Sequence, residues 1–307
     1  MPLQRFSHEA LFYRGMEDMV ATVAPFVREG VDLGEPVLVA MLPDRTRALR
    51  EALGPAAASV TFLDMEETGR NPARIIPAWQ HFLDSYPDDR TVRGVGEPVW
   101  AGRREVEVDE CNLHESLLNV AFDDGPAWRL LCPYDAAALS DTVVRNAIRT
   151  HPVVWGQERD VEYAGHEHAL SKFTEALAPS HFDADEITFS GADLSGLRSI
   201  VLRMGVQSGI GRDAADDITL AAHELATNSV LHGGGGGSLR AWTQPDAFVV
   251  EVRDAGRIVD PLVGRERGFA LAEGGRGLWM ANRLCDLVQV RSTREGTVVR
   301  LFTWRQL

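Results

Sequence analysis

The chain has 307 residues, a net charge of −14, and only one lysine, Lys172, among its 31 basic residues. The length predicts two domains, and 45% hydrophobic with 25% charged residues is typical of globular proteins. The single lysine excludes lysine-dependent nucleotide sites, because Lys172 follows Ser171 in no Gly-rich phosphate loop. It also fits neither the strand lysine of a protein kinase nor the desolvated lysine of a Schiff-base enzyme.

The sequence predicts a cytoplasmic protein that contacts neither membrane nor nucleic acid. No apolar run approaches the roughly 20 residues that cross a bilayer, and the N-terminus lacks the apolar stretch of a signal peptide. Three widely spaced cysteines, Cys111, Cys132 and Cys285, indicate a reducing compartment. Acidic residues exceed basic ones by 26 to 16 in 1–160 and by 19 to 15 in 161–307, so neither half predicts a phosphate-binding face.

Residues 1–160 are predicted to form an α/β layered domain. Continuous apolar or β-rich runs predict strands at 36–42, 59–63, 91–95 and 128–132. Amphipathic stretches between them predict helices at 17–29, 44–53, 73–86, 108–122 and 136–149. This alternation favours a mostly parallel sheet. Residues 161–192, punctuated by glycines and Pro179, are interpreted as a connector.

Residues 193–307 predict a second domain, an α+β sandwich. Two helices are predicted at 193–209 and 213–232. They precede four strands, at 238–244, 247–254, 286–292 and 297–304, and one further helix, at 277–285, between the second and third of these strands. Five consecutive glycines, 233–237, follow the second helix. One glycine would be enough to end a helix, so the run predicts mobile backbone or a close approach to a ligand.

Four short motifs in this second domain carry polar side chains or glycines that are suited to contact with a ligand. Glu224 and Asn228 are four residues apart, so they lie on one face of a helix. Asp254 continues the core-facing row of its strand, and a carboxylate there needs donors such as the amine of a purine. Glycines before the helix at Gly277 present free N–H groups to an anion, and Thr297 adds a hydroxyl. Taken singly, each also fits an ordinary surface, turn or cap residue.

In this order, the motifs Glu-x-x-x-Asn, Asp-x-Gly, Gly-x-Gly and Gly-Thr resemble the asparagine box, the glycine boxes and the terminal box of the Bergerat ATP-binding fold. That family includes histidine kinases, the gyrase ATPase subunit, a class of heat-shock chaperones and mismatch-repair ATPases. The runs 224–233 and 275–279 are most similar to anti-sigma-factor serine kinases. The resemblance covers about 190–307.

The resemblance implies ATP and Mg²⁺ as cofactors. Glu224 would be the general base, Asn228 would hold Mg²⁺, and 257–274 would form a lid over the phosphates. The residues that it implies in cofactor binding are Asn228, His232, Asp254, Gly256, Arg265, Arg267, Gly275, Arg276, Gly277, Leu278 and Thr297. The first glycine box departs from the family pattern, because Arg-Ile-Val rather than a further glycine follows Gly256. Whether ATP is turned over or only bound therefore stays open.

The first domain resembles the MEDS sensory domain over roughly residues 5–160. The resemblance lies in the runs 8–13, 93–100, 114–119, 131–135 and 151–152. It implies a RecA-like α/β fold that senses a small ligand, and without a P-loop lysine we expect a sensor rather than an ATPase. Six residues of metal-ligating type also fall here: His8, Glu110, His114, Glu115, Cys132 and His151. Because they lack ligand-type spacing, we interpret them as core or surface residues, with a metal site as the alternative.

Three functional hypotheses follow. The first is a signalling kinase that phosphorylates Ser or Thr on an anti-anti-sigma (STAS) partner while binding a sigma factor, and the resemblance implies a homodimer. The second is a non-catalytic switch controlled by ATP occupancy. The third is a histidine kinase, which needs two long helices bearing a phosphoacceptor histidine. The stretch 165–175 is too short for that and is closed by Pro179, so we predict that His166 and His168 are exposed connector residues.

Overall fold

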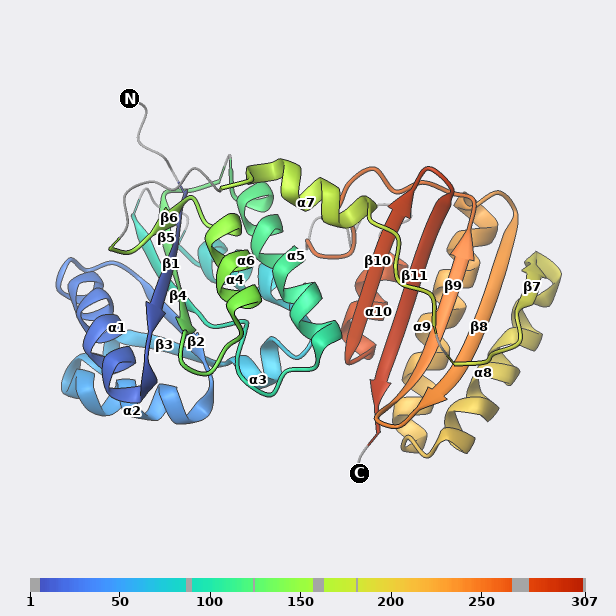
Figure 1. Cartoon of the computed structure of the whole chain (residues 1–307), viewed down its shortest axis with the longest axis horizontal. Helices are drawn as coiled ribbons and strands as arrows, with labels where there is room; N and C mark the ends of the chain where they lie inside the picture. The colour runs from blue at the N-terminus through green and yellow to red at the C-terminus, as the bar shows by residue number, and fades with distance from the viewer. Residues whose placement is uncertain are drawn as a thin grey trace. The chain divides into compact units, whose positions relative to one another are not determined.

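The computed structural model describes residues 6–86, 90–123, 125–156, 163–180, 182–266 and 276–305. The chain divides into two compact units, Met1–Ala169 and Leu170–Leu307. Each unit contains one sheet with its own helices (Figure 1). Together they confirm the predicted fold class, a parallel α/β unit followed by an antiparallel α+β unit.

The first unit is built on a six-stranded sheet in the order β3-β2-β4-β5-β1-β6, in which every pair of neighbours is parallel. Its strands are β1 (Phe6–Tyr13), β2 (Val37–Met41), β3 (Val60–Asp64), β4 (Val92–Gly96), β5 (Trp128–Asp135) and β6 (Val153–Val154). The sequence prediction missed β1, although it pairs with both β5 and β6. The polar residues His8 and Glu9 interrupt its apolar pattern, and the fold buries both of them.

Helices cover both faces of this sheet. Its helices are α1 (Gly15–Asp32), α2 (Pro43–Leu53), α3 (Met65–Thr68), α4 (Ile75–Asp84), α5 (Glu105–Ala121) and α6 (Asp141–Thr150), with 3-10 turns η1 (Gly54–Ser59) and η2 (Pro72–Arg74). The core formed by α1 and α2 includes Leu11 of β1. On the opposite face, Trp79 of α4 packs against Trp128 of β5, with ring centroids 5.5 Å apart. His8 also lies on this face, because it hydrogen-bonds to Asn119 of α5.

The second unit is a five-stranded antiparallel sheet in the order β10-β11-β9-β8-β7. Its strands are β7 (Ile187–Ser190), β8 (Gly236–Gln244), β9 (Ala247–Asp254), β10 (Leu287–Thr293) and β11 (Gly296–Trp304). Its helices are α8 (Leu194–Ser208), α9 (Arg212–His232) and α10 (Arg276–Leu284), with the 3-10 turn η3 (Gly191–Asp193). The predicted row Phe248, Val250 and Val252 lies in one core with Ile218 and Leu225 of α9.

The other face of this sheet has a buried ion-pair cluster. Glu251 of β9 accepts hydrogen bonds from Arg300 of β11, at 2.9 Å and 2.5 Å, and from Arg253 at 2.8 Å. Burial alone would raise the pKa of Glu251, but these hydrogen bonds outweigh it and lower the pKa below its usual value. The carboxylate therefore stays charged inside the fold.

The predicted connector, 161–192, contains regular structure. It includes the helix α7 (Gly165–Thr174) and the strand β7, which joins the second sheet. His166 is exposed as predicted, whereas His168 is only 8% exposed, so the prediction of an exposed His168 is wrong. His168 lies on the side of α7 that also buries Ala169 and Phe173. Lys172 is on the outer side and pairs with Glu175 at 2.8 Å.

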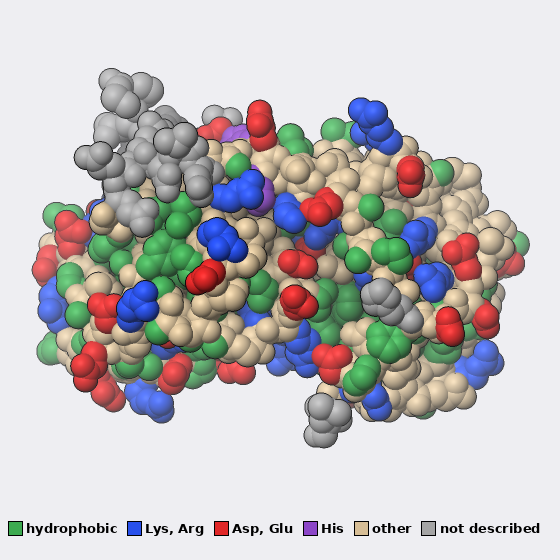
Figure 2. All heavy atoms as spheres, in the orientation of Figure 1, with side chains coloured by type: hydrophobic (Ala, Val, Ile, Leu, Met, Phe, Trp, Pro, Cys, Tyr) green, Lys and Arg blue, Asp and Glu red, His purple; other side chains and the backbone are tan. Residues whose placement is uncertain are grey.

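The surface and the cysteines are unremarkable for a chain of this composition. Acidic and basic side chains are interspersed on the face drawn in Figure 2. The three cysteines are buried and form no disulfide. Within the described ranges, no helix has the length and apolar character that a membrane crossing requires.

Candidate functional site

Helix α9 carries the predicted catalytic and magnesium-binding residues, Glu224 and Asn228. Both side chains are half-buried and one turn apart on the same face. Among the described residues, neither side chain has a hydrogen-bond or ion-pair partner. Asn228 lines the pocket described below, whereas Glu224, one turn earlier, does not. A carboxylate and an amide that the fold leaves unpaired are available to a ligand.

Asp254 lies at the end of β9, beside α9. One carboxylate oxygen, Oδ2, accepts a hydrogen bond of 2.7 Å from the hydroxyl of Ser229, and the other, Oδ1, accepts one of 2.8 Å from the backbone N–H of Gly256. Each carboxylate oxygen can accept about two hydrogen bonds. The two protein donors therefore fix the orientation of Asp254 and leave acceptor capacity for a ligand amine.

A chain of hydrogen bonds holds the loop that follows Asp254. Thr297 of β11 donates to the carbonyl oxygen of Gly256 at 2.8 Å, and its own Oγ1 lies 3.1 Å from the hydroxyl of Ser292. Ser292 in turn accepts from the backbone N–H of Ile258 at 2.9 Å. The Thr297 proton is thus used inside the protein, so this residue shapes the pocket wall rather than offering a free donor.

Two glycines allow the close packing at the site. A Cβ on Gly256 would lie 2.8 Å from the carbonyl oxygen of His232 and 2.9 Å from Asp254 Oδ1. A Cβ on Gly277, in the first turn of α10, would lie 2.4 Å from Asn228 Nδ2 and 3.5 Å from Glu224 Cβ. A real Cβ makes no such contacts, so both positions require glycine for the observed packing.

These elements enclose a pocket of about 240 Å³. Its polar lining includes Asn228, Ser229, Asp254 and Thr297, and its apolar walls are Leu225, Val252, Ile258, Val263, Leu278 and Val299. Apolar walls with a few fixed polar groups are typical of small-molecule sites. Asp254 and Asn228 both line this pocket, so one ligand could contact both.

The glycine run 233–237 has two roles in the structure. Gly234 and Gly235 have φ values of +97° and +95°, which turn the chain out of α9. Gly236 and Gly237 begin β8 and pair with Ser190 and Phe189. Gly233 packs so tightly on Asp254 that a Cβ would lie 2.5 Å from Asp254 Cγ. The close approach in the structure is therefore to Asp254, whereas the sequence predicted one to a ligand.

The predicted cofactor-binding residues differ in how they meet the pocket. Asn228, His232, Asp254, Gly256, Leu278 and Thr297 line it, and Gly277 packs against Asn228. Arg276 is exposed at the start of α10, whereas Arg265 is buried next to Gly264, and neither lines the pocket. Arg267 and Gly275 lie outside the described residues.

Sequence reasoning missed three contributors to the site. Ser229 lies on the buried, otherwise apolar side of α9, and its hydroxyl donates to Asp254. Ser292 supports the Thr297 hydroxyl, and Arg257 lines the pocket. A hydroxyl on an otherwise apolar helix stripe was the available signal for Ser229. Ser292 could be found only through the pairing of Ser292 with Thr297 across β10 and β11.

The residues present fit a purine nucleotide with a divalent cation. Asp254 can accept from an exocyclic amine between apolar walls, and the Asn228 amide oxygen is a hard ligand of the kind that Mg²⁺ prefers. Gly277 leaves a space beside Asn228 that a Cβ would fill. The N-terminal turn of α10 adds N–H groups at the same place, which suits a phosphate.

The six metal-ligating residue types of the first unit are all buried. Four of them, His8, Glu115, Cys132 and His151, form one group. Glu110 and His114 lie on the same helix as Glu115 but outside this group. Sequence spacing gave no sign of this grouping, because its members come from four separate segments.

Comparison with known families assigns a domain to each unit. Residues 7–152 match the family model described as MEDS, the MEthanogen/methylotroph, DcmR Sensory domain. Residues 187–303 match the histidine kinase-like ATPase domain. No curated protein matches the chain.

Proposed function

We propose, starting from a MEDS sensory domain and a histidine kinase-like ATPase domain in one chain, that this is a cytoplasmic signalling kinase of the anti-sigma-factor type. The first unit senses a small molecule. The second binds Mg·ATP, phosphorylates Ser or Thr on an anti-anti-sigma (STAS) partner and binds a sigma factor. The combination of the two domains fits a signalling protein.

The observation that carries the nucleotide part is the Asp254 arrangement. A carboxylate held by Ser229 and the Gly256 N–H, with capacity left over, faces a pocket with apolar walls. Such a carboxylate selects a ligand with a donor, and the exocyclic amine of adenine is one. An apolar ligand would leave the remaining acceptor capacity of this partly buried carboxylate unsatisfied.

The protein's own residues would position the reacting groups. Bound ATP would supply the phosphoryl group to be transferred. Asn228 would hold Mg²⁺ against the phosphates, and the first turn of α10 would orient them through backbone N–H groups. Glu224, one turn before Asn228 and without a protein partner, would accept the proton of the attacking hydroxyl.

Two alternatives remain, and each makes a different prediction. A non-catalytic switch would bind ATP through Asp254 and Asn228 but would not need Glu224. A histidine kinase would need a phosphoacceptor helix pair, whereas α7, the one helix in the described part of 163–186, has 10 residues. This length favours the serine/threonine hypothesis over the histidine one.

Nucleotide binding can be tested by thermal stabilisation of the full chain. ATP with Mg²⁺ at a hundredfold excess over its Kd should stabilise the wild type by about 2.7 kcal/mol. Asp254→Asn should abolish stabilisation with and without Mg²⁺, and Asn228→Ala should abolish mainly the Mg²⁺-dependent part. Asp216→Asn is the matched control, because that carboxylate pairs with Arg212 on the exposed side of α9. No stabilisation of the wild type would refute the nucleotide proposal.

Phosphoryl transfer can be tested with labelled ATP and a panel of STAS proteins. The wild type should label a Ser or Thr of one of them, and Glu224→Gln should bind ATP normally while losing transfer. Equal transfer by Glu224→Gln would refute the assigned role of Glu224. Acid-labile label on His166 or His168 would instead support the histidine-kinase alternative.

A further inference from the structure

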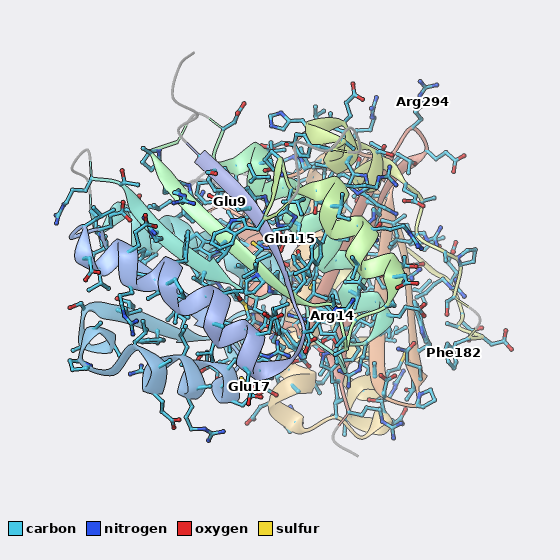
Figure 3. The ribbon with its side chains drawn as sticks, turned by 60° about the vertical axis from the view of Figure 1, so that its left-hand side comes forward. Glu9, Arg14, Glu17, Glu115, Phe182 and Arg294 are labelled. Carbon is cyan, nitrogen blue, oxygen red and sulfur yellow. The ribbon has the colours of Figure 1, made fainter. Side chains whose placement is uncertain are left out.

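Four metal-ligating side chains converge in the interior of the first unit. His8 comes from β1, Glu115 from α5, Cys132 from β5, and His151 from the residue after α6. They are between 0% and 2% exposed. In Figure 3 the label of Glu115 lies beside the ribbon of β1, the strand that carries His8, and the 2% exposure of Glu115 places its side chain in the interior. Burial of four such groups at one point needs a physical explanation.

The distances within this group are short. Glu115 Oε2 lies 3.0 Å from His8 Nε2 and 3.1 Å from His151 Nε2. Cys132 Sγ lies 3.4 Å from His8 Nε2, and one ligand atom from each residue lies within 4.8 Å of all the others. All four side chains therefore aim a potential ligand atom at the same small space.

The tautomer of His8 is set by Asn119. The Asn119 amide nitrogen donates to the carbonyl oxygens of Glu115 and Thr150, at 3.2 Å and 2.8 Å. Its oxygen, which can only accept, is therefore the atom that lies 3.1 Å from His8 Nδ1. His8 Nδ1 must carry the proton, so the Nε2 atom of a neutral His8 presents a lone pair to Glu115 and Cys132.

The tautomer of His151 is set in the same way. His151 Nδ1 lies 2.7 Å from the carbonyl oxygen of Ala147, which can only accept. Nδ1 is therefore the donor, and Nε2 of a neutral His151 presents its lone pair to Glu115. Metal-bound histidines usually donate their second ring N–H to a carbonyl or carboxylate in this manner, which fixes the ring for the metal.

The result is a buried group in which acceptors outnumber donors, because the Cys132 thiol, 3.4 Å from His8 Nε2, is the one donor that these four side chains direct into it. Two imidazole lone pairs face a carboxylate, and neither oxygen of Glu115 nor Nε2 of His151 has a hydrogen bond of good geometry among the described residues. Acceptors packed at about 3 Å repel one another unless a positive charge lies between them. That charge is either one proton, shared between histidine and Glu115, or a metal ion.

The dimensions and the ligand chemistry favour the metal ion. Bonds of about 2.0–2.3 Å in a tetrahedral zinc site place ligand atoms about 3.3–3.8 Å apart, close to the observed spacing. Two imidazoles, one thiol and one carboxylate form a mixed N, S and O set that suits Zn²⁺ rather than Mg²⁺ or Ca²⁺. A single added proton would satisfy Glu115 and one histidine, with the Cys132 thiol as a weak donor to His8 at 3.4 Å, whereas a metal ion would engage all four ligand atoms.

We propose that His8, Glu115, Cys132 and His151 bind one transition-metal ion of the Zn²⁺ type inside the MEDS domain. Asn119 and the Ala147 carbonyl orient the two histidines, and the Cys132 thiol proton is released to solvent when the ion binds. A cavity of about 20 Å³, lined by Glu115 and Tyr134, adjoins the site. It is large enough for about one water molecule, which would lie on the carboxylate side of the ion.

The proposal can be tested with tag-free, full-length protein that has been stripped by a chelator. Titration with Co²⁺ should give visible absorption bands of tetrahedral cobalt and a near-ultraviolet sulfur-to-cobalt band, both saturating at one ion per chain. Zn²⁺ should then displace the Co²⁺ and remove both sets of bands. Elemental analysis of unstripped protein should show which metal the chain retains from cells.

Variants distinguish a cysteine that binds the metal from a cysteine that is needed only for packing in the core. Cys132→Ser should remove the sulfur-to-cobalt band and weaken binding by at least about 100-fold, whereas Asn119→Ala should weaken it by roughly 10–100-fold through the orientation of His8. Cys111→Ser is the matched control, because Cys111 is equally buried on α5 but its thiol donates to the Pro98 carbonyl, outside the group. It should retain the full spectrum.

Two results would overturn the proposal. One is a wild-type chain that takes up neither Co²⁺ nor Zn²⁺, in which case the group is a proton-sharing His–Glu pair. The other is a sulfur-to-cobalt band that Cys111→Ser removes and Cys132→Ser retains. If Cys132→Ser fails to fold, the wild-type stoichiometry and the Cys111→Ser spectrum still decide the question, since the remaining cysteine, Cys285, belongs to the other unit.

Discussion

Replacement of Gly277 by alanine is the most direct test of how the ATPase-domain site is assembled. The added Cβ would lie 2.4 Å from Asn228 Nδ2, 3.3 Å from Asn228 Cγ and 3.5 Å from Glu224 Cβ. The first two contacts are too short to persist. The atoms in the way belong to the end of a flexible side chain, so Asn228 can rotate away while the backbone stays in place.

The expected magnitudes differ for folding and for binding. Overpacking costs about 1–3 kcal/mol, and alanine in place of glycine in a helix returns up to about 1 kcal/mol. We therefore expect a net destabilisation of about 0–2 kcal/mol. Nucleotide binding should suffer more, because the displaced Asn228 amide no longer faces the phosphates. We expect Mg·ATP affinity to fall at least about tenfold, which corresponds to about 1.4 kcal/mol.

The assay pairs chemical denaturation with calorimetric titration of Mg·ATP. Gly196→Ala is the matched control, since Gly196 is exposed in the first turn of α8 and a Cβ there meets nothing within 4 Å. This variant should be as stable as the wild type or slightly more stable, and should bind ATP normally. Unchanged ATP affinity in Gly277→Ala would refute the idea that the first turn of α10 and Asn228 form one site.

Further predictions concern stability. Ser229→Ala should cost about 1–2 kcal/mol in denaturant melts, because Asp254 loses its 2.7 Å donor; an unchanged melt would show that Ser229 bonds elsewhere. The pKa of Glu251 is lower in the folded state than in the unfolded state, where it is about 4.3. Its ion pairs therefore stabilise the fold fully above the unfolded pKa, and this contribution is lost as the pH falls through the folded pKa. The stability gap between wild type and Glu251→Gln should therefore be largest near pH 7 and shrink in acid, and a gap independent of pH would contradict this. Arg93→Ala should destabilise the first unit by about 3 kcal/mol, because Glu35 and the Phe26 carbonyl lose their buried donor. Arg28→Ala is the control for the same melts and should change stability little, because the guanidinium of Arg28 is exposed.

The sequence was most informative where periodicity and burial coincide. The alternation of Phe248, Val250 and Val252 correctly predicted β9 and its core-facing side. It was least informative where polar residues are buried. β1 was missed because His8 and Glu9 look like surface residues, although Glu9 is held by Arg129 and Trp155 at 2.9 Å and 2.7 Å.

Of the residues predicted to act on the nucleotide, Asn228 and Asp254 line the pocket and Glu224 does not, and the hydrogen bonds that support the pocket were not predicted. Glu224, Asn228 and Asp254 follow from helix and strand spacing, which sets which residues share a face. Ser229 and Ser292 act through hydrogen bonds to residues 25 and 5 positions away. The strand pairing and the packing of α9 on the sheet determine those contacts, and no local pattern encodes them.

By itself, the sequence determined the fold class and indicated an ATPase domain in the second unit. These depend on local periodicity and on short motifs with fixed spacing. Only the tertiary structure decided that His8, Glu115, Cys132 and His151 meet at one point. A parallel sheet brings together strands that are distant in sequence, here β1 and β5, and the helices packed on it add residues from α5 and from the end of α6. Ligand geometry of that kind depends on side-chain directions across the layers of the fold, which sequence spacing does not record.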